Sequence, residues 1–491
     1  MVFRPRILLL AAALALLTAC GSRDDDEALR IAYIGEPGDL VDKGLRLSAP
    51  AQQIRAATAE GLVSLNETGD VVPALAERWI VTDDGSSYIF RLRNSEWRDG
   101  STIEADEVRD ALRRTIRALA GTSLGLDFAP VAEIRAMTGR VIEIRLATPV
   151  PDFLQLLAQP ELGVLHKGAG AGPMTAVRAD KAKEAGAGVL LSLLPPEARG
   201  LPMRQNWREG TRVLAVQAEP ATRAVALFRE RAVDLVLGGR LATLPLADTG
   251  PLSRGTVRLD AAQGIMGLQV VRADGLLAEA ARREALAMAI ERETLLAPFN
   301  VAGWLATTRI APSAVAGNAP ERWAGLTIEQ RRAEARRRIA AFGGPDKAVV
   351  RVSLPAGPGS NLLFAELASD WQEIGVSAVR VGEGQPADLA FVDTLARLGG
   401  RAWYLNQFAC AVRRTLCSAE ADALVAAAAR EADPVARGTM LAEAEERLTA
   451  LNGFIPLGAP VRWSLVRGDI EGFAENRWSL HPLSPLALGP T

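Results

Sequence analysis

Histidine and cysteine are scarce in this sequence of 491 residues. The only histidines are His166 and His481, and the three cysteines are Cys20, Cys410 and Cys417. A structural zinc site takes four ligands, usually Cys and His, so we expect no metal. A serine hydrolase needs a histidine base, and neither histidine lies in a recognisable catalytic motif. G-x-S-x-G and Walker motifs are absent too. We expect no cofactor and no enzyme, although pairs of carboxylates leave a glycosidase-like dyad open.

No charge of one sign dominates. Lys and Arg number 56 against 58 Asp and Glu, for a formal net charge of −2. A nucleic-acid partner would require a clear positive excess, so we expect none. After the N-terminal segment, no apolar run is long enough to cross a bilayer. The chain is long enough for at least two hydrophobic cores.

The N-terminal segment has the pattern of a processing signal. Arg4 and Arg6 precede a short apolar run at 7–17, and Leu-Thr-Ala-Cys at 17–20 has the form of a bacterial lipobox. Cleavage before Cys20 would expose this cysteine for lipidation, and each buried lipid methylene contributes ~0.8 kcal/mol to membrane binding. The alternative is an ordinary secreted protein with a chance cysteine near its cleavage site.

The stretch 73–112 carries the most information. Asp-Asp-Gly at 83–85 predicts a turn, and the alternation along 88–93 predicts a strand with one wetter face. A helix follows, with acidic residues at 106–107 in its first turn, where the helix dipole favours carboxylates. By itself this is a strand, a turn and an amphipathic helix, and it names no function.

The same stretch resembles a signature of the substrate-binding proteins of ABC importers, in the peptide/nickel group called extracellular solute-binding family 5. The matching positions are Pro73, Leu75, Ala76, Trp79, Asp84, Gly85, Tyr88, Phe90, Leu92, Arg93, Trp97, Asp99, Gly100, Ala105 and Val108. The resemblance covers nearly the whole mature chain, densely before residue 119 and patchily at 178–212.

The resemblance implies an α/β fold: a two-lobed periplasmic binding protein of type II. It has an extra subdomain in the first lobe, mixed sheets flanked by helices, and a hinge between the lobes. We expect the chain to cross between lobes near 260–265 and 462–466. The implied domains are a signal peptide at 1–19, a tether at 20–28, lobe I at 29–262 with its subdomain at about 49–166, lobe II at 263–463, and a return to lobe I at 464–491.

Local patterns predict further elements. They are strands at 29–33 and 141–146, a capping box at Thr327 and Gln330, a β-α-β unit over 349–381, and helices at 419–431 and 434–450.

The implied function is that of a lipid-anchored, extracytoplasmic solute-binding component of an ABC transporter. It would capture a peptide-like or other small polar solute and deliver it to permease subunits, on the periplasmic side of a bacterial membrane. The alternative is a lipoprotein that uses the same fold as a sensor or assembly partner, outside transport.

Peptide binders of this family usually carry an acidic-proline element in the second lobe. Here the matching stretch is 388–408, and Arg-Leu-Gly-Gly at 397–400 stands near the place of that element. Asp393 is the only nearby carboxylate, and it is a candidate ligand-binding residue or a helix cap. The other candidates for lining the cleft are Trp403, Tyr404, Asn406 and Gln407. A position in the core or on the surface remains open for each.

Cys410 and Cys417 are the cysteines that remain after processing. An even count in an oxidising compartment favours a disulfide over two buried thiols.

Overall fold

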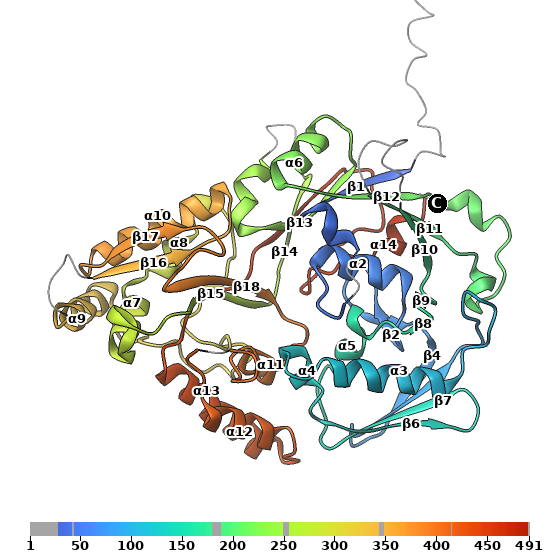
Figure 1. Cartoon of the computed structure of the whole chain (residues 1–491), viewed down its shortest axis with the longest axis horizontal. Helices are drawn as coiled ribbons and strands as arrows, with labels where there is room; N and C mark the ends of the chain where they lie inside the picture. The colour runs from blue at the N-terminus through green and yellow to red at the C-terminus, as the bar shows by residue number, and fades with distance from the viewer. Residues whose placement is uncertain are drawn as a thin grey trace, which may run out of the picture.

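The structure is a computed structural model that describes residues 28–41, 44–178, 188–248, 255–342, 348–413 and 415–489. It has an α/β fold with two mixed sheets flanked by helices, one in each lobe (Figure 1). In the view of Figure 1 the second lobe lies at the left and the first lobe at the right. The expected fold class is confirmed.

The first lobe is built on the larger sheet, whose strand order is β10-β11-β12-β1-β13-β20-β14. β1 pairs in parallel with β12 and β13, and the outer pairs are antiparallel. The strands are β1 (Leu29–Ile34), β10 (Met174–Arg178), β11 (Gly188–Leu193), β12 (Leu214–Glu219), β13 (Leu235–Arg240), β14 (Val257–Asp260) and β20 (Arg462–Val466). Helix α6 (Ala221–Arg229) packs on this sheet, as does α2 (Ala49–Thr58) at β10.

Strands β4 and β5 of the signature stretch join β6 and β7 in a separate antiparallel sheet, in the order β4-β5-β7-β6. Tyr88, Phe90 and Leu92 of β5 are buried, as the alternation predicted. The first turn of α3 contains Asp106 and Glu107 as expected. These elements are β4 (Ala76–Val81), β5 (Ser87–Leu92), β6 (Val131–Met137), β7 (Val141–Leu146), α3 (Ala105–Ala118), α4 (Ser123–Asp127) and α5 (Phe153–Leu157).

The second lobe is built on the sheet β17-β16-β18-β15-β19. The predicted β-α-β unit is confirmed, because β16 and β17 pair in parallel and α10 connects them. The predicted capping box at Thr327 and Gln330 opens α9. The strands are β15 (Gly264–Val270), β16 (Val349–Ser353), β17 (Ser377–Val381), β18 (Leu389–Leu395) and β19 (Phe454–Gly458). The helices are α7 (Ala280–Ala289), α8 (Arg292–Leu295), α9 (Ile328–Ala340), α10 (Pro358–Gln372), α11 (Arg401–Asn406), α12 (Ala419–Ala428) and α13 (Pro434–Ala450).

The described fold also contains short elements. They are β2 (Val63–Leu65), β3 (Val71–Pro73), β8 (Leu165–His166), β9 (Ala169–Gly170), α14 (Leu483–Leu486) and the 3-10 helix η2 (Pro160–Leu162).

The chain passes between the two large sheets at 261–263, between β14 and β15, as expected. The second passage lies at 459–461, between β19 and β20. The expectation of 462–466 is corrected, because those residues form β20 and pair with β13 and β14 in the first lobe. The domain limits stay a prediction.

The lobes share a hydrophobic cluster. Buried apolar residues of the subdomain, including Phe128 and Ile144, belong to the same cluster as Leu398, Trp403 and Leu405 of the second lobe. Helices α4 and α11 lie side by side at this junction (Figure 1). The structure therefore holds the lobes in contact with each other.

Candidate functional site

A cavity of about 430 Å³ lies where the subdomain of the first lobe meets the second lobe. Its walls come from 126–151 on one side and 398–448 on the other, and most of the lining side chains are apolar. Representative lining residues are Leu126, Pro130 and Val150 of the first lobe and Leu398, Leu405 and Leu441 of the second. A volume of this size is within the range of small-molecule sites.

A carboxyl–amide pair joins the lobes at the wall of this cavity. Asn406, the last residue of α11, donates from Nδ2 to Asp127 Oδ1 over 2.7 Å, and both side chains are buried. Asp127 is the last residue of α4, whose first turn is capped by the hydroxyl of Thr122. Burial raises the pKa of Asp127 to about 7, against smaller lowering effects of the hydrogen bond from Asn406 and the charge of Arg397. Within the described residues, Asp127 Oδ2 has no hydrogen-bond partner.

Arg397 makes a second bridge between the lobes. Its Nη2 lies 3.2 Å from Glu161 Oε1, and its Nη1 donates to Gln159 Oε1 over 2.8 Å. Gln159 in turn donates from Nε2 to the Arg397 carbonyl over 3.3 Å. Glu161 belongs to η2, and its side chain is only 4% exposed. A guanidinium thus stands close to the expected place of the acidic-proline element.

Two more hydrogen bonds join the lobes at the cavity. Thr148 donates from Oγ1 to the Ala429 carbonyl over 2.7 Å, and Arg437 donates from Nη1 to the Pro149 carbonyl over 3.1 Å. In each of these hydrogen bonds the donor and the acceptor belong to different lobes, so opening the lobes would break the bond.

Asp393 lies outside this cavity wall, inside β18. Its carboxylate pairs with Arg462 of β20, with 2.7 Å between Arg462 Nη1 and Asp393 Oδ1, and both side chains are 6% exposed. The alternative of a helix cap is wrong, because the residue lies within a strand. The pair connects the two large sheets beside the passage at 459–461. Its role in binding stays a prediction.

Of the other predicted cleft residues, the structure brings Asn406 to the cavity. Trp403 and Tyr404 are buried and touch each other edge to face, with 4.9 Å between ring centroids. Burial raises the pKa of Tyr404 to about 12. Gln407 is buried too and donates to the Trp403 carbonyl over 3.1 Å. These three residues belong to the packed interior around α11, and a role in binding stays a prediction for them.

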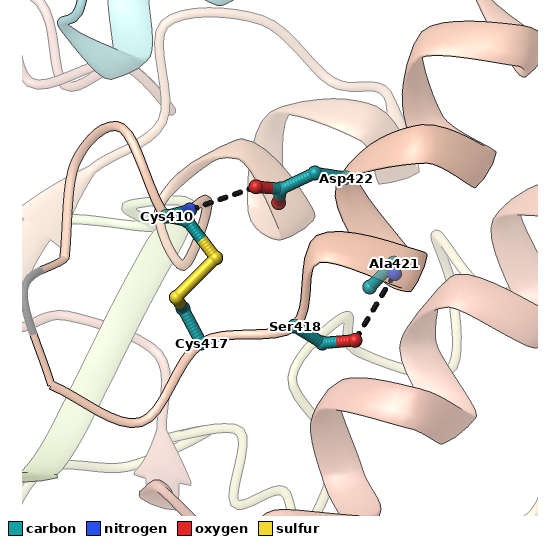
Figure 2. The surroundings of a disulfide bond; sticks show 5 residues. All are labelled: Cys410, Cys417, Ser418, Ala421 and Asp422. Carbon is teal, nitrogen blue, oxygen red and sulfur yellow. Dashed lines mark hydrogen bonds between the residues drawn. A yellow bond between two sulfur atoms is a disulfide. The ribbon is translucent and has the colours of Figure 1, made fainter.

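Cys410 and Cys417 form a disulfide in the connection from α11 to α12 (Figure 2). The backbone N–H of Cys410 donates to Asp422 Oδ2 over 2.9 Å, and the Ser418 hydroxyl accepts from Ala421 N over 3.1 Å at the start of α12. Asp422 also lines the cavity. The bridge therefore braces one wall of the cavity. Cys20, the predicted lipidation site, lies outside the described residues.

Sequence reasoning missed Asp127, Gln159 and Glu161. The available signal for Asp127 was an acid between the apolar residues Leu126 and Phe128, close to a helix end. The chain holds 58 acids, and such a position is also common on protein surfaces. The partners of these residues lie more than two hundred positions away, beyond the reach of local patterns.

The arrangement is suited to enclosing a solute. It offers a mostly apolar wall, the buried carboxyl of Asp127, and hydrogen bonds between the two lobes. No group of three or more His, Cys, Asp and Glu in the described ranges is placed to hold a metal ion. None of the described helices combines the length and apolar character needed to cross a bilayer.

Part of the chain matches a known protein family. Residues 70–189 match the family described as bacterial extracellular solute-binding proteins, family 5 middle region. The chain is 32% identical over 145 residues to the probable deoxycholate-binding periplasmic protein YgiS of Escherichia coli K12. This alignment covers 26% of this chain and 27% of YgiS. It is 28% identical over 141 residues to the periplasmic murein peptide-binding protein MppA of the same organism. This alignment covers 25% of this chain and 26% of MppA. The aligned part thus spans about a quarter of these curated relatives.

Solved structures extend the likeness to nearly the whole chain. Haemophilus influenzae OppA in complex with RPPGFSPFR has a TM-score of 0.77 at 17% identity, with 94% of this chain and 99% of that chain covered. The Escherichia coli murein tripeptide binding protein MppA has a TM-score of 0.77 at 18% identity, with 95% and 99% covered. Both of these structures are of peptide-binding proteins, and they show that this chain shares their fold. The match over residues 70–189 agrees with the resemblance seen in the sequence, and the solved structures show the same fold over nearly the whole chain.

Proposed function

We propose that this protein captures a small solute between its two lobes and delivers it to the permease of an ABC importer. The observation that carries the proposal is the cavity of about 430 Å³ whose walls come from both lobes. A solute held there touches the two walls together only when the lobes are closed. Differential contact of this kind is the condition under which a ligand drives closure.

The relatives supply the first solutes to test. Their names specify deoxycholate, murein peptide and glutathione, which differ widely in charge and shape. For this chain, Arg397 lies near the place of the acidic-proline element, which argues against a peptide whose free amino group is held at that place. The apolar walls favour a solute with a larger apolar surface than a dipeptide has.

The test is small-angle scattering and thermal unfolding of the purified mature protein against peptides, glutathione and bile acids. A transported solute should raise the melting temperature and should hold or increase the compactness of the protein. If no compound in broad peptide, glycan and lipid-like libraries changes either quantity, the transport proposal fails.

Membrane anchoring through Cys20 is a separate part of the proposal. It is supported by the lipobox at 17–20 and the apolar run before it. Wild-type protein expressed in bacteria should enter the detergent phase on Triton X-114 partition, and the variant Cys20→Ser should stay in the aqueous phase. Equal aqueous partition of both proteins would remove the anchor and leave the solute proposal standing.

One observation favours a second function, that of a lipoprotein outside transport. Arg397 and Glu161 join the lobes with the chain's own charges, without a solute. A protein locked in this way would act as a fixed surface for a partner. Scattering of the ligand-free protein decides between the two: a closed form that no solute alters favours the second function, and an open form that a solute compacts favours transport.

A further inference from the structure

The polar groups around the interlobe cavity are unequal in their hydrogen bonding. In the described part of the chain, Thr148 and Arg437 donate to carbonyls, and Asp422 accepts from Cys410 N. Asn406 donates to Asp127 Oδ1. Asp127 Oδ2 alone among these carboxyl, amide and hydroxyl oxygens is buried with no partner within the described residues.

An acceptor without a protein partner is unfavourable at this buried position. A buried polar atom without a partner loses the hydrogen bonds of water and gains none in return. The lining is mostly apolar, and its donors Thr148 and Arg437 already donate to carbonyls, while Asn406 donates to the other oxygen of Asp127. A bound molecule that brings a donor to this carboxyl would recover the lost interaction.

The cations nearby do not supply that donor. Arg397 is held by Gln159 and Glu161. Arg401, which lines the cavity, donates from Nη2 to the Ala316 carbonyl and lies beside Glu445, with 3.5 Å between its Nε and Glu445 Oε2. The charge of Arg397 reaches Asp127 and stabilises the carboxylate, yet no hydrogen bond joins the two groups among the described residues.

We propose that the cavity binds an apolar solute through one hydrogen-bond-donating head group, an ammonium or a hydroxyl, which donates to the carboxyl of Asp127. The inference rests on the proposed function and narrows its solute class. The body of the solute contacts the side chains of Leu126, Val150 and Leu405, and the lobes close around it. A solute with a carboxylate head is disfavoured, because two acidic groups would meet in an apolar surrounding.

The test uses three compounds with one rigid hydrocarbon body: 1-adamantanamine, 1-adamantanol and 1-adamantanecarboxylate. Titration calorimetry on the whole mature protein measures the dissociation constant of each. At pH 8.5, where the carboxyl of Asp127 is ionised in the folded protein, the amine or the alcohol should bind about ten- to a hundredfold more tightly than the carboxylate, as expected for a hydrogen bond to a charged group. Comparison of the amine with the alcohol shows which donor the site prefers.

The variant Asp127→Asn keeps the shape of the side chain and should abolish the preference for a donor head. The matched control is Asp110→Asn, since Asp110 pairs with Arg109 at the surface of α3 and is not among the residues that line the cavity. This control should bind all three compounds as the wild type does. The comparison of heads on wild-type protein remains decisive even if a variant fails to fold.

The inference is overturned if the carboxylate binds as tightly as the other two, if Asp127→Asn keeps the wild-type preference, or if none of the three binds at 1 mM. In each case the proposed function survives if another solute compacts the protein. Only a complete absence of solute binding removes both.

Discussion

The guanidinium of Arg397 lies 3.2 Å from the carboxylate of Glu161, and this ion pair links two lobes across 236 positions of sequence. The Glu161 side chain is 4% exposed and that of Arg397 is 24% exposed. Removing one partner of a largely buried pair is costly, since the other charge is left desolvated. The pair therefore favours contact between the lobes even when no solute is present.

The variant Arg397→Met tests this role. Met fills much of the same space without the charge, so Glu161 would become an unpaired buried acid. We expect the free energy of unfolding to fall by about 3 kcal/mol and the radius of gyration of the ligand-free protein to rise. Urea unfolding and small-angle scattering measure the two quantities.

The control for this variant is Arg91→Gln. Arg91 pairs with Glu77, but both side chains are more than two-fifths exposed. Solvent screens such a pair, so a change below about 1 kcal/mol is expected. If Arg397→Met is as mild as the control and the protein stays compact, the pair does not hold the lobes.

Asp127 predicts a dependence of stability on pH. Burial raises its pKa from an ordinary value near 3.8 to about 7 in the folded protein. Between those values the folded state binds more protons than the unfolded state, so this group makes stability fall as pH rises. The loss is complete above the folded pKa and amounts to as much as about 4 kcal/mol, because a tenfold change in proton affinity is about 1.4 kcal/mol.

Asp127→Asn removes this effect. The variant should gain stability relative to the wild type as pH rises from 4.5 to 8, and urea unfolding midpoints of both proteins across that range provide the measurement. A difference that stays constant with pH would show that the Asp127 carboxyl is not desolvated in solution.

Local elements were predictable because their causes are local. The burial of Tyr88, Phe90 and Leu92 follows from the alternation of apolar and polar residues. The start of α9 follows from the capping box, in which the Thr327 side chain accepts from Gln330 N and the Gln330 side chain accepts from Thr327 N. The antiparallel pairing of β10 with β11 was not foreseen, because it falls where the family pattern is patchy. Pairing of distant strands depends on register, which no short segment contains.

The site was predictable only in part for the same reason. Asn406 was singled out by its polarity beside aromatic residues, and the structure brings it to the cavity. Trp403 and Tyr404 share its short helix, yet they lie in the core because α11 is covered on several sides. Six residues give too few turns for a sequence to show which face is open. Asp127, 279 positions away, has no pattern that ties it to Asn406.

Asp393 predicts an effect on stability that is separate from solute selection. The variant Asp393→Asn leaves Arg462 buried without its acid partner, and Arg240 nearby has its pKa lowered by burial and by the charge of Arg462. We expect a loss of about 3–5 kcal/mol in the free energy of unfolding. The ratio of affinities among the three adamantane compounds should stay within twofold, since Asp393 is not part of the cavity lining.

The control here is Glu77→Gln, which removes one partner of the exposed pair with Arg91 and should change stability by less than about 1 kcal/mol. A reversed order of head-group affinity in Asp393→Asn would place this carboxylate in the binding site and contradict the structural assignment.

The disulfide between Cys410 and Cys417 closes a short loop, with a sequence separation of 7. Loop closure of this size stabilises the folded state by about 2–3 kcal/mol in the chain-entropy account. Because Ala409, Ala411 and Asp422 beside the bridge line the cavity, loss of the disulfide should also weaken solute binding.

Thermal unfolding and calorimetry of the double variant Cys410→Ala/Cys417→Ala measure both effects. A reductant should lower the melting temperature of the wild type toward that of the variant and should leave the variant unchanged. An equal effect of the reductant on both proteins would mean that it acts elsewhere, and an unaltered affinity in the double variant would mean that the bridge does not brace the cavity wall.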